Sequence, residues 1–168
     1  WWKGFYDGWH YFDGSVSAVE NGWVLDKGNW YWMDGLSHMA VNTWVHDGDK
    51  WYWMDESGHM LRGGWHLIGG TWYYLTGSGA MATGWLNDRD TWYYLHSSGK
   101  MGQAWVHDGT GWYWMDPSSG RMDAGGWRNI WGSWYYLSGS GKAVEGWMPY
   151  RGSWYYMQPG NAQMRTGW

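Results

Sequence analysis

Tryptophan recurs in this chain as a spaced pair, and the pair itself recurs at a nearly constant interval. A Trp is followed seven residues later by a second Trp eight times in succession, and the first members of successive pairs lie 20 to 22 residues apart. A repeat of this length is one supersecondary unit, which buries its apolar face only by stacking on its neighbours. The spacing therefore predicts a single repeat array over residues 1–168. Its eight units are 2–22, 23–43, 44–64, 65–84, 85–104, 105–126, 127–146 and 147–168, and Trp168 is expected to open a ninth.

Each unit is predicted to be one β-hairpin followed by a linking turn. The second Trp heads a run of four residues, such as WYWM at 51–54 or WYYL at 72–75. Aromatic residues favour strands, and no segment of the chain has the periodicity of a helix. We therefore expect an all-β fold, a solenoid of stacked β-hairpin repeats.

The residues between the paired tryptophans predict the hairpin turns. Asp47-Gly48 and Asp108-Gly109 lie midway between their tryptophans and favour two-residue turns, because the backbone of Asp-Gly matches the twist of the strands. In other units Gly stands one place later, which predicts a three-residue loop closed by a left-handed glycine. These glycines are Gly28, Gly70, Gly132 and Gly152.

A turn centred between the tryptophans would place the two rings directly opposite each other. Trp44 and Trp51 would then share a face, and strand alternation adds Trp53 to it, while Tyr52 and Met54 point to the other side. We expect this other side to form the structural core. Its expected members are the tyrosine of each tetrad together with Met54, Leu75, Met81 and Leu95.

Composition excludes several classes of function. The formal net charge is −4 and Lys and Arg do not cluster, so we expect no nucleic-acid partner. No apolar run has the length of a membrane span, so we expect no membrane insertion. Cys is absent, which excludes disulfides and Cys-ligated metals. The chain opens with Trp1-Trp2 rather than Met and a leader, so we expect a processed, excised or engineered fragment.

No constellation in the sequence predicts catalysis, a cofactor or a metal. His46 and His107 occupy equivalent strand positions that we expect at the surface, and no short His pair suggests a ligand set. Asp34, Asp55 and Asp116 follow the WYWM tetrads, where Asp stabilises turns by hydrogen bonding. An acid/base pair needs one convergent site, whereas a repeat offers the same carboxylate in every unit. We therefore expect a protein that is not an enzyme.

The repeat resembles a known family, the choline-binding repeats of pneumococcal autolysins, phage lysins and surface proteins. The motif that carries the resemblance is GWHLIGGTWYYLTGSGAMATGW at 64–85, and related versions run through nearly the whole chain. The resemblance implies a left-handed superhelix of hairpins. It also implies a ligand site between consecutive hairpins, made of two Trp rings from one unit and one aromatic ring from the next.

Carried over to this chain, the family pattern implies seven aromatic cages. They are Trp2/Trp9/Trp32, Trp23/Trp30/Trp53, Trp44/Trp51/Tyr74, Trp65/Trp72/Tyr94, Trp85/Trp92/Trp114, Trp105/Trp112/Tyr136 and Trp127/Trp134/Tyr156. The first tetrad, WHYF at 9–12, departs from the pattern. The pair Trp147/Trp154 has no tetrad after it, so its site is expected to be incomplete. Ser37, Thr43 and Ala104 stand where glycine is usual, and we expect them to alter the rotation between hairpins.

A box of aromatic rings suits a quaternary ammonium group, whose charge is diffuse and whose surface is methyl. Cation–π contact is worth roughly 0.5–2 kcal/mol per ring, and Trp is the best partner. The expected partner is choline or a choline-decorated teichoic or lipoteichoic acid. The expected location is secreted, at the surface or cell wall of a Gram-positive bacterium or in its phage.

Two alternatives to choline binding stay open at this point. Glucan-binding repeats resemble this one, but sugars need recurrent hydrogen-bonding side chains beside the ring, and the recurrent positions here are aromatic and apolar. An engineered repeat scaffold is the other alternative. The sequence also leaves open a homodimer formed through the terminal hairpins.

Overall fold

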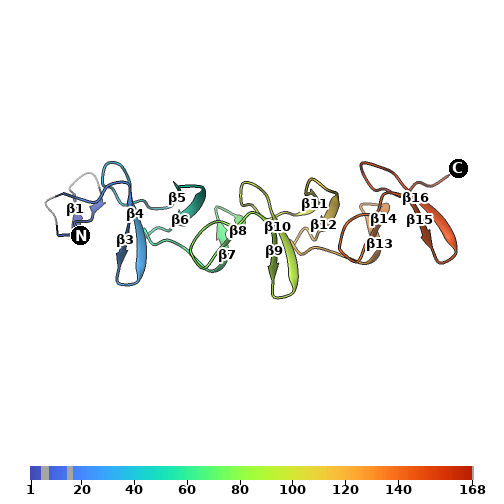
Figure 1. The fold of residues 1–168 in the computed structure, drawn as a ribbon, viewed down its shortest axis with the longest axis horizontal. Coiled ribbons are helices and arrows are strands. Elements are labelled where there is room, and N and C mark those ends of the chain that lie inside the picture. The colour runs from blue at the N-terminus through green and yellow to red at the C-terminus, as the bar shows by residue number, and fades with distance from the viewer. Residues whose placement is uncertain (5–7, 15–16, 168) are drawn as a thin grey trace. The chain divides into compact units, whose positions relative to one another are not determined.

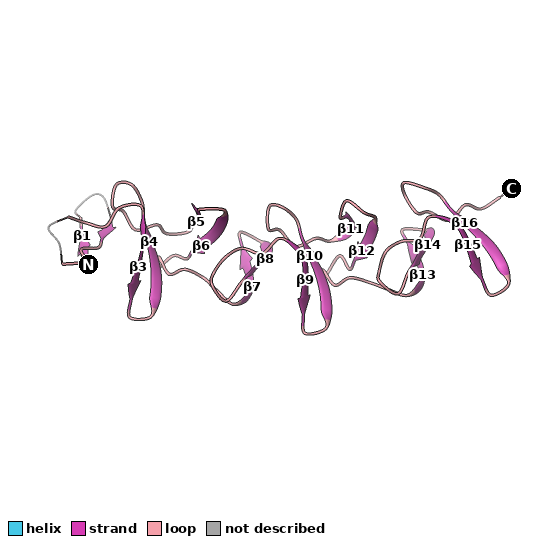
Figure 2. Ribbon diagram, viewed as in Figure 1, coloured by secondary structure: helices cyan, strands magenta, loops and turns pink. Residues whose placement is uncertain are grey.

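The fold is a series of two-stranded β-hairpins. The computed structural model describes residues 1–4, 8–14 and 17–167, and every regular element within these ranges is a strand (Figures 1 and 2). Each strand pairs only with its neighbour in sequence, in antiparallel fashion. The hairpins are β1 (Trp2–Lys3) with β2 (Trp9–His10), β3 (Gly22–Asp26) with β4 (Asn29–Met33), β5 (Thr43–Asp47) with β6 (Lys50–Met54), β7 (Gly64–Ile68) with β8 (Thr71–Leu75), β9 (Gly84–Asp88) with β10 (Thr91–Leu95), β11 (Ala104–His107) with β12 (Trp112–Met115), β13 (Gly126–Ile130) with β14 (Ser133–Leu137), and β15 (Gly146–Tyr150) with β16 (Ser153–Met157).

The hairpins group into two compact units of four. The first unit is Trp1–Ala82, with β1 to β8, and the second is Thr83–Trp168, with β9 to β16. The prediction of an all-β array of hairpins is confirmed. The single array over residues 1–168 and the left-handed winding stay predictions, and Trp168 lies outside the described residues.

The strand register differs by two residues from the predicted one. Trp44 lies opposite Trp53, and Trp51 lies opposite His46, so the paired tryptophans are not directly opposite each other. Side chains alternate with a period of two, so a shift of two residues keeps every side chain on its face. The prediction that Trp44, Trp51 and Trp53 share a face is therefore confirmed, although the register behind it was wrong.

The hairpin turns explain the shift. Asp26 pairs with Asn29, which leaves Lys27 and Gly28 as a two-residue turn with φ of 48° and 83°. Two positive φ values identify a type I′ turn, whose twist matches that of the strands. The predicted three-residue loops are therefore wrong. The same two-residue turn occurs at Gly69-Gly70, Trp131-Gly132 and Arg151-Gly152.

The two Asp-Gly turns also differ from the prediction. In the third hairpin Asp47 pairs with Lys50, so the turn residues are Gly48 and Asp49. In the sixth hairpin His107 pairs with Trp112, which leaves a four-residue loop at 108–111. A turn lies closer to the second Trp than to the first, so the midpoint between the tryptophans does not mark it.

The core lies on the face opposite the paired tryptophans. Met33, Met54 and Leu75 end the second strands of their hairpins and are fully buried, as are their equivalents further along the chain. Each forms an isolated β-bridge with an apolar residue in the linker that follows, such as Met54 with Met60. The predicted core positions of Met54, Leu75 and Leu95 are confirmed, whereas Met81 is only partly buried.

The linkers hold consecutive hairpins together within each unit. In the first unit the backbone N–H of Met60 donates to the carbonyl oxygen of Trp30 at 2.8 Å, and that of Met81 donates to Trp51 at 2.8 Å. In the second unit Met122 donates to Trp92 at 2.9 Å. The linker after one hairpin thus bonds to the hairpin before it, and within each unit the Trp face of one hairpin meets the tyrosine face of the next.

Ser37 and Ala104, two of the three residues that replace glycine, keep the glycine conformation, whereas Thr43 does not have a positive φ. Ser37 has a φ of 61° where Gly58 and Gly79 have 77° and 88°, and Ala104 has 59° where Gly84 has 78°. A left-handed backbone costs roughly 1–2 kcal/mol for a residue with a Cβ. The local fold is kept at these positions, and altered rotation between hairpins stays a prediction.

Substitution of Gly79 by Ala should destabilise the first unit by about 1–3 kcal/mol. Gly79 has a φ of 88°, and an added Cβ would lie 2.6 Å from Sδ of Met60. Gly77 in the same linker is a matched control, because an added Cβ would meet nothing within 4 Å. Thermal unfolding followed by circular dichroism should show a lower midpoint for Gly79→Ala only. Equal midpoints for the two variants would contradict this account of the linker.

Candidate aromatic binding sites

A cluster of aromatic rings lies between consecutive hairpins. Trp23 and Trp30 come from β3 and β4, with ring centroids 6.3 Å apart and planes at 89°. Tyr52 on β6 of the next hairpin reaches Trp23, with centroids 4.9 Å apart and planes at 73°. Three rings set nearly at right angles form the walls of a box rather than a stack.

The same arrangement recurs in both units. In the second unit, the two tryptophan centroids are 6.3 Å apart for Trp85 and Trp92, 6.5 Å for Trp105 and Trp112, and 6.4 Å for Trp127 and Trp134. The tyrosine of the next hairpin lies 4.7 to 4.9 Å from the first Trp, through Tyr113, Tyr135 and Tyr155. In the first unit Trp44 contacts Tyr73 at 4.9 Å in the same way.

A methionine from the linker completes the box. A cavity of about 390 Å³ is lined by Trp85, Trp92, Tyr113 and Met122, together with Gly139 and Ser140. In the first unit a cavity of about 380 Å³ has the equivalent lining of Trp1, Trp9, Tyr31 and Met39. Volumes in this range admit a small organic ligand. Methionine was not among the predicted site residues, although its recurrence in the linker was the available signal.

The third ring differs from the predicted one. The ring that packs on Trp23 from the next hairpin is Tyr52 rather than Trp53, because Trp53 lies on the other face of β6 and contacts Trp44 of its own hairpin at 5.3 Å. Hairpins stack with the Trp face of one against the tyrosine face of the next, so the third ring comes one residue earlier in each tetrad. The predicted third rings Trp32, Trp53, Tyr74, Tyr94, Trp114, Tyr136 and Tyr156 instead lie opposite the first Trp of their own hairpins.

The seventh predicted cage shows how the second tryptophan of a pair is placed. Trp134 on β14 pairs with Asn129, and Trp127 pairs with Tyr136. The ring predicted to join Trp134 from the next hairpin, Tyr156, instead contacts Trp147 of its own hairpin at 5.1 Å. The side chain of Trp134 is 45% exposed, so it forms the solvent-facing wall of its candidate site.

The first site contains Trp1 in place of the predicted Trp2. Trp1 contacts Tyr31 of the next hairpin at 4.7 Å and lines the cavity together with Trp9. Lys3 pairs with Trp9 and Trp2 pairs with His10, so Trp2 and Trp9 point to opposite faces. The seven-residue spacing predicted Trp2 for this site. The register of the first hairpin is shifted by one residue from the predicted pairing of Trp2 with Trp9, and a shift of one residue moves Trp2 to the other face.

The fourth predicted cage and the last tryptophan pair differ from the other sites. Trp65 and Trp72 belong to the first unit and Tyr94 to the second, so the fourth cage stays a prediction. Trp147 and Trp154 are 57% and 66% exposed, consistent with the incomplete site expected there.

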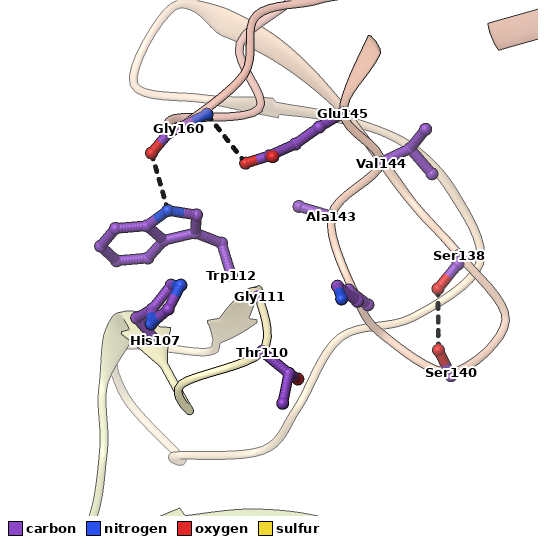
Figure 3. Close-up of a pocket in the computed structure, with 11 residues that line it drawn as sticks. His107, Thr110, Gly111, Trp112, Ser138, Ser140, Ala143, Val144, Glu145 and Gly160 are labelled. Atoms are coloured by element: carbon purple, nitrogen blue, oxygen red, sulfur yellow. Dashed lines mark hydrogen bonds between the residues drawn. The ribbon is translucent and has the colours of Figure 1, made fainter. Parts of the chain in front are cut away.

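The site at Trp105 and Trp112 departs from the others. Ala143 stands where the other sites have methionine and is buried, and the Trp112 indole N–H donates to the carbonyl oxygen of Gly160 at 2.8 Å. A wider cavity of about 670 Å³ lies beside Trp112 (Figure 3). Its lining is mixed and includes the polar side chains of His107, Thr110, Ser138, Ser140, Lys142 and Glu145. The Gly160 N–H donates to Oε1 of Glu145 at 3.1 Å and closes one side of it.

The aspartates that follow the WYWM tetrads serve the turns, as predicted. Oδ1 of Asp55 accepts hydrogen bonds from the backbone N–H groups of Ser57 and His59, each at 2.8 Å, and Asp34 has equivalent partners. At Asp116 the hydroxyl groups of Ser118 and Ser119 lower the carboxyl pKa to about 2.

The histidines do not form a metal site in the described part of the chain. His46 and His107 are exposed, as predicted, and each packs on the second Trp of its hairpin, at 4.6 Å from Trp51 and 4.9 Å from Trp112. Residues 1–4, 8–14 and 17–167 contain no group of three or more His, Asp or Glu side chains that could hold a metal. Those ranges also contain no helix able to cross a membrane.

Comparison with known families supports the repeat. A model of the choline-binding repeat matches residues 62–105. A model of a cell wall binding repeat matches residues 21–35, 42–60, 104–122 and 125–143. No curated protein sequence matches the chain.

Several solved structures are similar to this chain. CbpJ from Streptococcus pneumoniae TIGR4 is 36% identical over 93% of this chain and 56% of its own, with a TM-score of 0.78. The choline-binding domain of CbpL from Streptococcus pneumoniae is 31% identical over 85% of this chain and 76% of its own, with a TM-score of 0.66. The pneumococcal cell wall endolysin from phage Cp-1, complexed with choline, is 35% identical over 73% of this chain and 36% of its own, with a TM-score of 0.52. The chain thus spans little more than half of CbpJ.

Asp108 should make the stability of the second unit depend on pH. Burial opposes its ionisation, but hydrogen bonds from the Thr110 backbone, the Trp85 indole, the Thr110 hydroxyl and the Gly111 backbone outweigh burial and hold the pKa of Asp108 well below its ordinary range. A lowered folded-state pKa stabilises the fold above the unfolded pKa of about 3.9 and loses this effect as the pH falls toward the folded value.

Thermal unfolding of the wild type and of Asp108→Asn should therefore be compared at pH 6 and at pH 2.5. The wild type should have a higher unfolding midpoint than Asp108→Asn at pH 6, and the difference between the two midpoints should be smaller at pH 2.5. A difference of the same size at both values would show that the charge of Asp108 has no part in stability.

Proposed function

The chain belongs to the choline-binding repeat family, and on this basis we propose that it is a non-catalytic binding module that captures choline groups in the aromatic boxes between its hairpins. The sites are Trp1/Trp9/Tyr31, Trp23/Trp30/Tyr52, Trp44/Trp51/Tyr73, Trp85/Trp92/Tyr113, Trp105/Trp112/Tyr135 and Trp127/Trp134/Tyr155, with Trp65/Trp72 as the seventh predicted position.

One observation carries the proposal, namely three aromatic rings and a methionine around a small cavity. A trimethylammonium group donates no hydrogen bond, so a site for it needs π-faces for the charge and apolar surface for the methyl groups. The site of Trp85, Trp92, Tyr113 and Met122 provides both. The Cp-1 endolysin, whose structure holds choline, is 35% identical to this chain over the matched region and supports the same ligand here.

Weak sites in series suit a polymeric ligand. Each box offers roughly 0.5–2 kcal/mol per ring, which supports only modest affinity for free choline. Repeated sites on one chain raise avidity by ~10²–10⁴ when a ligand presents many cholines at compatible spacing. We take choline-decorated teichoic or lipoteichoic acid of a cell wall as that ligand, which makes the protein a secreted surface anchor. A homodimer through the terminal hairpins belongs to the same proposal, since Trp147 and Trp154 are exposed there.

Carbohydrate binding is a second candidate at one position only. The cavity beside Trp112 combines an indole with Thr110, Lys142 and Glu145, a mixture of donors and acceptors that suits sugar hydroxyl groups. The cavity at Trp85 and Trp92 has few polar groups in its lining. The cavity at Trp1 and Trp9 combines Asp26, Lys27 and Ser57 with the three rings and the methionine of the box.

A titration distinguishes these ligands. Choline and tetramethylammonium should each shift the indole N–H resonances of Trp85 and Trp92 to saturation, whereas glucose oligomers should leave them unchanged. A response of these residues to glucose oligomers alone would overturn choline binding. A response of Trp112 to the oligomers would support the second candidate.

Removal of one wall should weaken one site selectively. Tyr113→Ala should reduce the choline affinity at Trp85 and Trp92 by about fivefold to thirtyfold, the equivalent of about 1–2 kcal/mol for one ring. The matched control is Trp154→Ala, since Trp154 belongs to the last described hairpin and its side chain is 66% exposed. The same resonances report both variants, and an unchanged affinity in Tyr113→Ala would show that the tyrosine is not part of the site.

A further inference from the structure

In three of the sites the first Trp donates its indole N–H to an aspartate of the next hairpin. Nε1 of Trp1 lies 2.9 Å from Oδ2 of Asp26, and Nε1 of Trp23 lies 2.9 Å from Oδ2 of Asp47. In the second unit, Nε1 of Trp85 lies 3.0 Å from Oδ2 of Asp108. The contact repeats with the same atoms, so it is a property of the site rather than of one loop.

The aspartate occupies one position of the hairpin, and only some hairpins carry it. Asp26 and Asp47 end the first strands of their hairpins, and Asp108 directly follows β11. In the hairpins that follow Trp44, Trp105 and Trp127, the same position holds Ile68, Ile130 and Tyr150. The six sites therefore divide into acid-backed sites, at Trp1, Trp23 and Trp85, and sites without an acid at this one hairpin position, at Trp44, Trp105 and Trp127, which we call acid-free.

The carboxylate acts on a bound cation in two ways. A hydrogen bond from the indole N–H to an anion polarises the ring and makes its π-face more negative, which strengthens attraction for a cation. The carboxylate also attracts the cation directly through the partly solvated site. Asp26 itself lines the cavity together with Trp1 and Trp9. Both effects act on charge and leave an uncharged ligand of the same shape unaffected.

We infer that the aspartate is a charge-selecting residue, so that acid-backed sites discriminate a quaternary ammonium from a neutral group of equal size more strongly than acid-free sites do. The inference rests on the proposed choline binding and adds that the two kinds of site bind the ligand through different interactions. In acid-backed sites electrostatic attraction contributes more to binding of the cation, and in acid-free sites apolar contact with the methyl groups contributes more.

Two neighbouring sites of the first unit allow a comparison within one molecule. The Trp23 site is acid-backed through Asp47, and the Trp44 site has Ile68 at that position. Both have a methionine linker, through Met60 and Met81. The probes are choline and 3,3-dimethylbutan-1-ol, in which carbon replaces the charged nitrogen. The readout is the indole N–H resonance of each Trp during titration of the full chain.

In the wild type, the preference for choline over the alcohol should be on the order of threefold to tenfold greater at Trp23 than at Trp44, which is the range for a partly solvated charge pair. Asp47→Asn keeps an acceptor for the indole and removes the charge. It should lower choline affinity at Trp23 by a similar factor, leave alcohol affinity within about twofold and leave Trp44 unchanged. Added salt should narrow the difference between the sites.

Ile68→Asp is the reciprocal variant and should raise the choline preference at Trp44. If that variant does not fold, Asp108→Asn tests the same effect at Trp85 in the second unit. Equal losses of choline and alcohol in Asp47→Asn would assign the aspartate a structural role and overturn the inference. An unchanged choline affinity would overturn it as well. Absence of choline binding at both wild-type sites would instead overturn the proposed function.

Discussion

Each hairpin in this protein has two unlike faces, and the whole structure depends on how the face of one hairpin meets the face of the next. Strand alternation sends the paired tryptophans to one side and the tyrosine with its terminal Met or Leu to the other. A two-stranded hairpin is marginal by itself and has no interior in which to bury either side. Burial therefore comes from stacking unlike faces, and the linker hydrogen bonds between Met60 and Trp30 and between Met122 and Trp92 hold that arrangement.

The binding sites are a consequence of this stacking. Aromatic rings set at nearly right angles, as for Trp85 and Trp92, cannot fill space as densely as a core of aliphatic side chains, and a cavity stays between their hairpin and the next. Leu95 and Met115, the fully buried residues of these two hairpins, do not line that cavity. The terminal Met or Leu thus stabilises the hairpin, whereas the tyrosine of the same face joins the tryptophans of the preceding hairpin around the site, whose other residues can vary. Ala143 beside Trp112 shows such a variation, and so does the exchange of Asp47 for Ile68 beside neighbouring sites.

Predictions from strand alternation are confirmed where an error in the register does not change the face on which a residue lies. The shared face of Trp44, Trp51 and Trp53 was predicted correctly from a wrong register, because the error was an even number of residues. The first hairpin shows the opposite case. There the register is shifted by one residue, so Trp1 rather than Trp2 faces the site. The turn residues were misplaced because a type I′ turn needs two positive φ values in succession, and pairs other than Asp-Gly supply them here, as Lys27-Gly28 does.

The sequence by itself determined that the chain is an array of β-hairpins with tryptophan on one face, because spacing and alternation are local properties of the chain. The tertiary structure decided which ring of the next hairpin closes each site, since that depends on the face presented by a neighbour some 20 residues away. It also decided that methionine completes the box and that an aspartate lies behind some of the tryptophans and not others. Contacts of this kind form only when two hairpins stack, and they cannot be predicted from the pattern within one repeat.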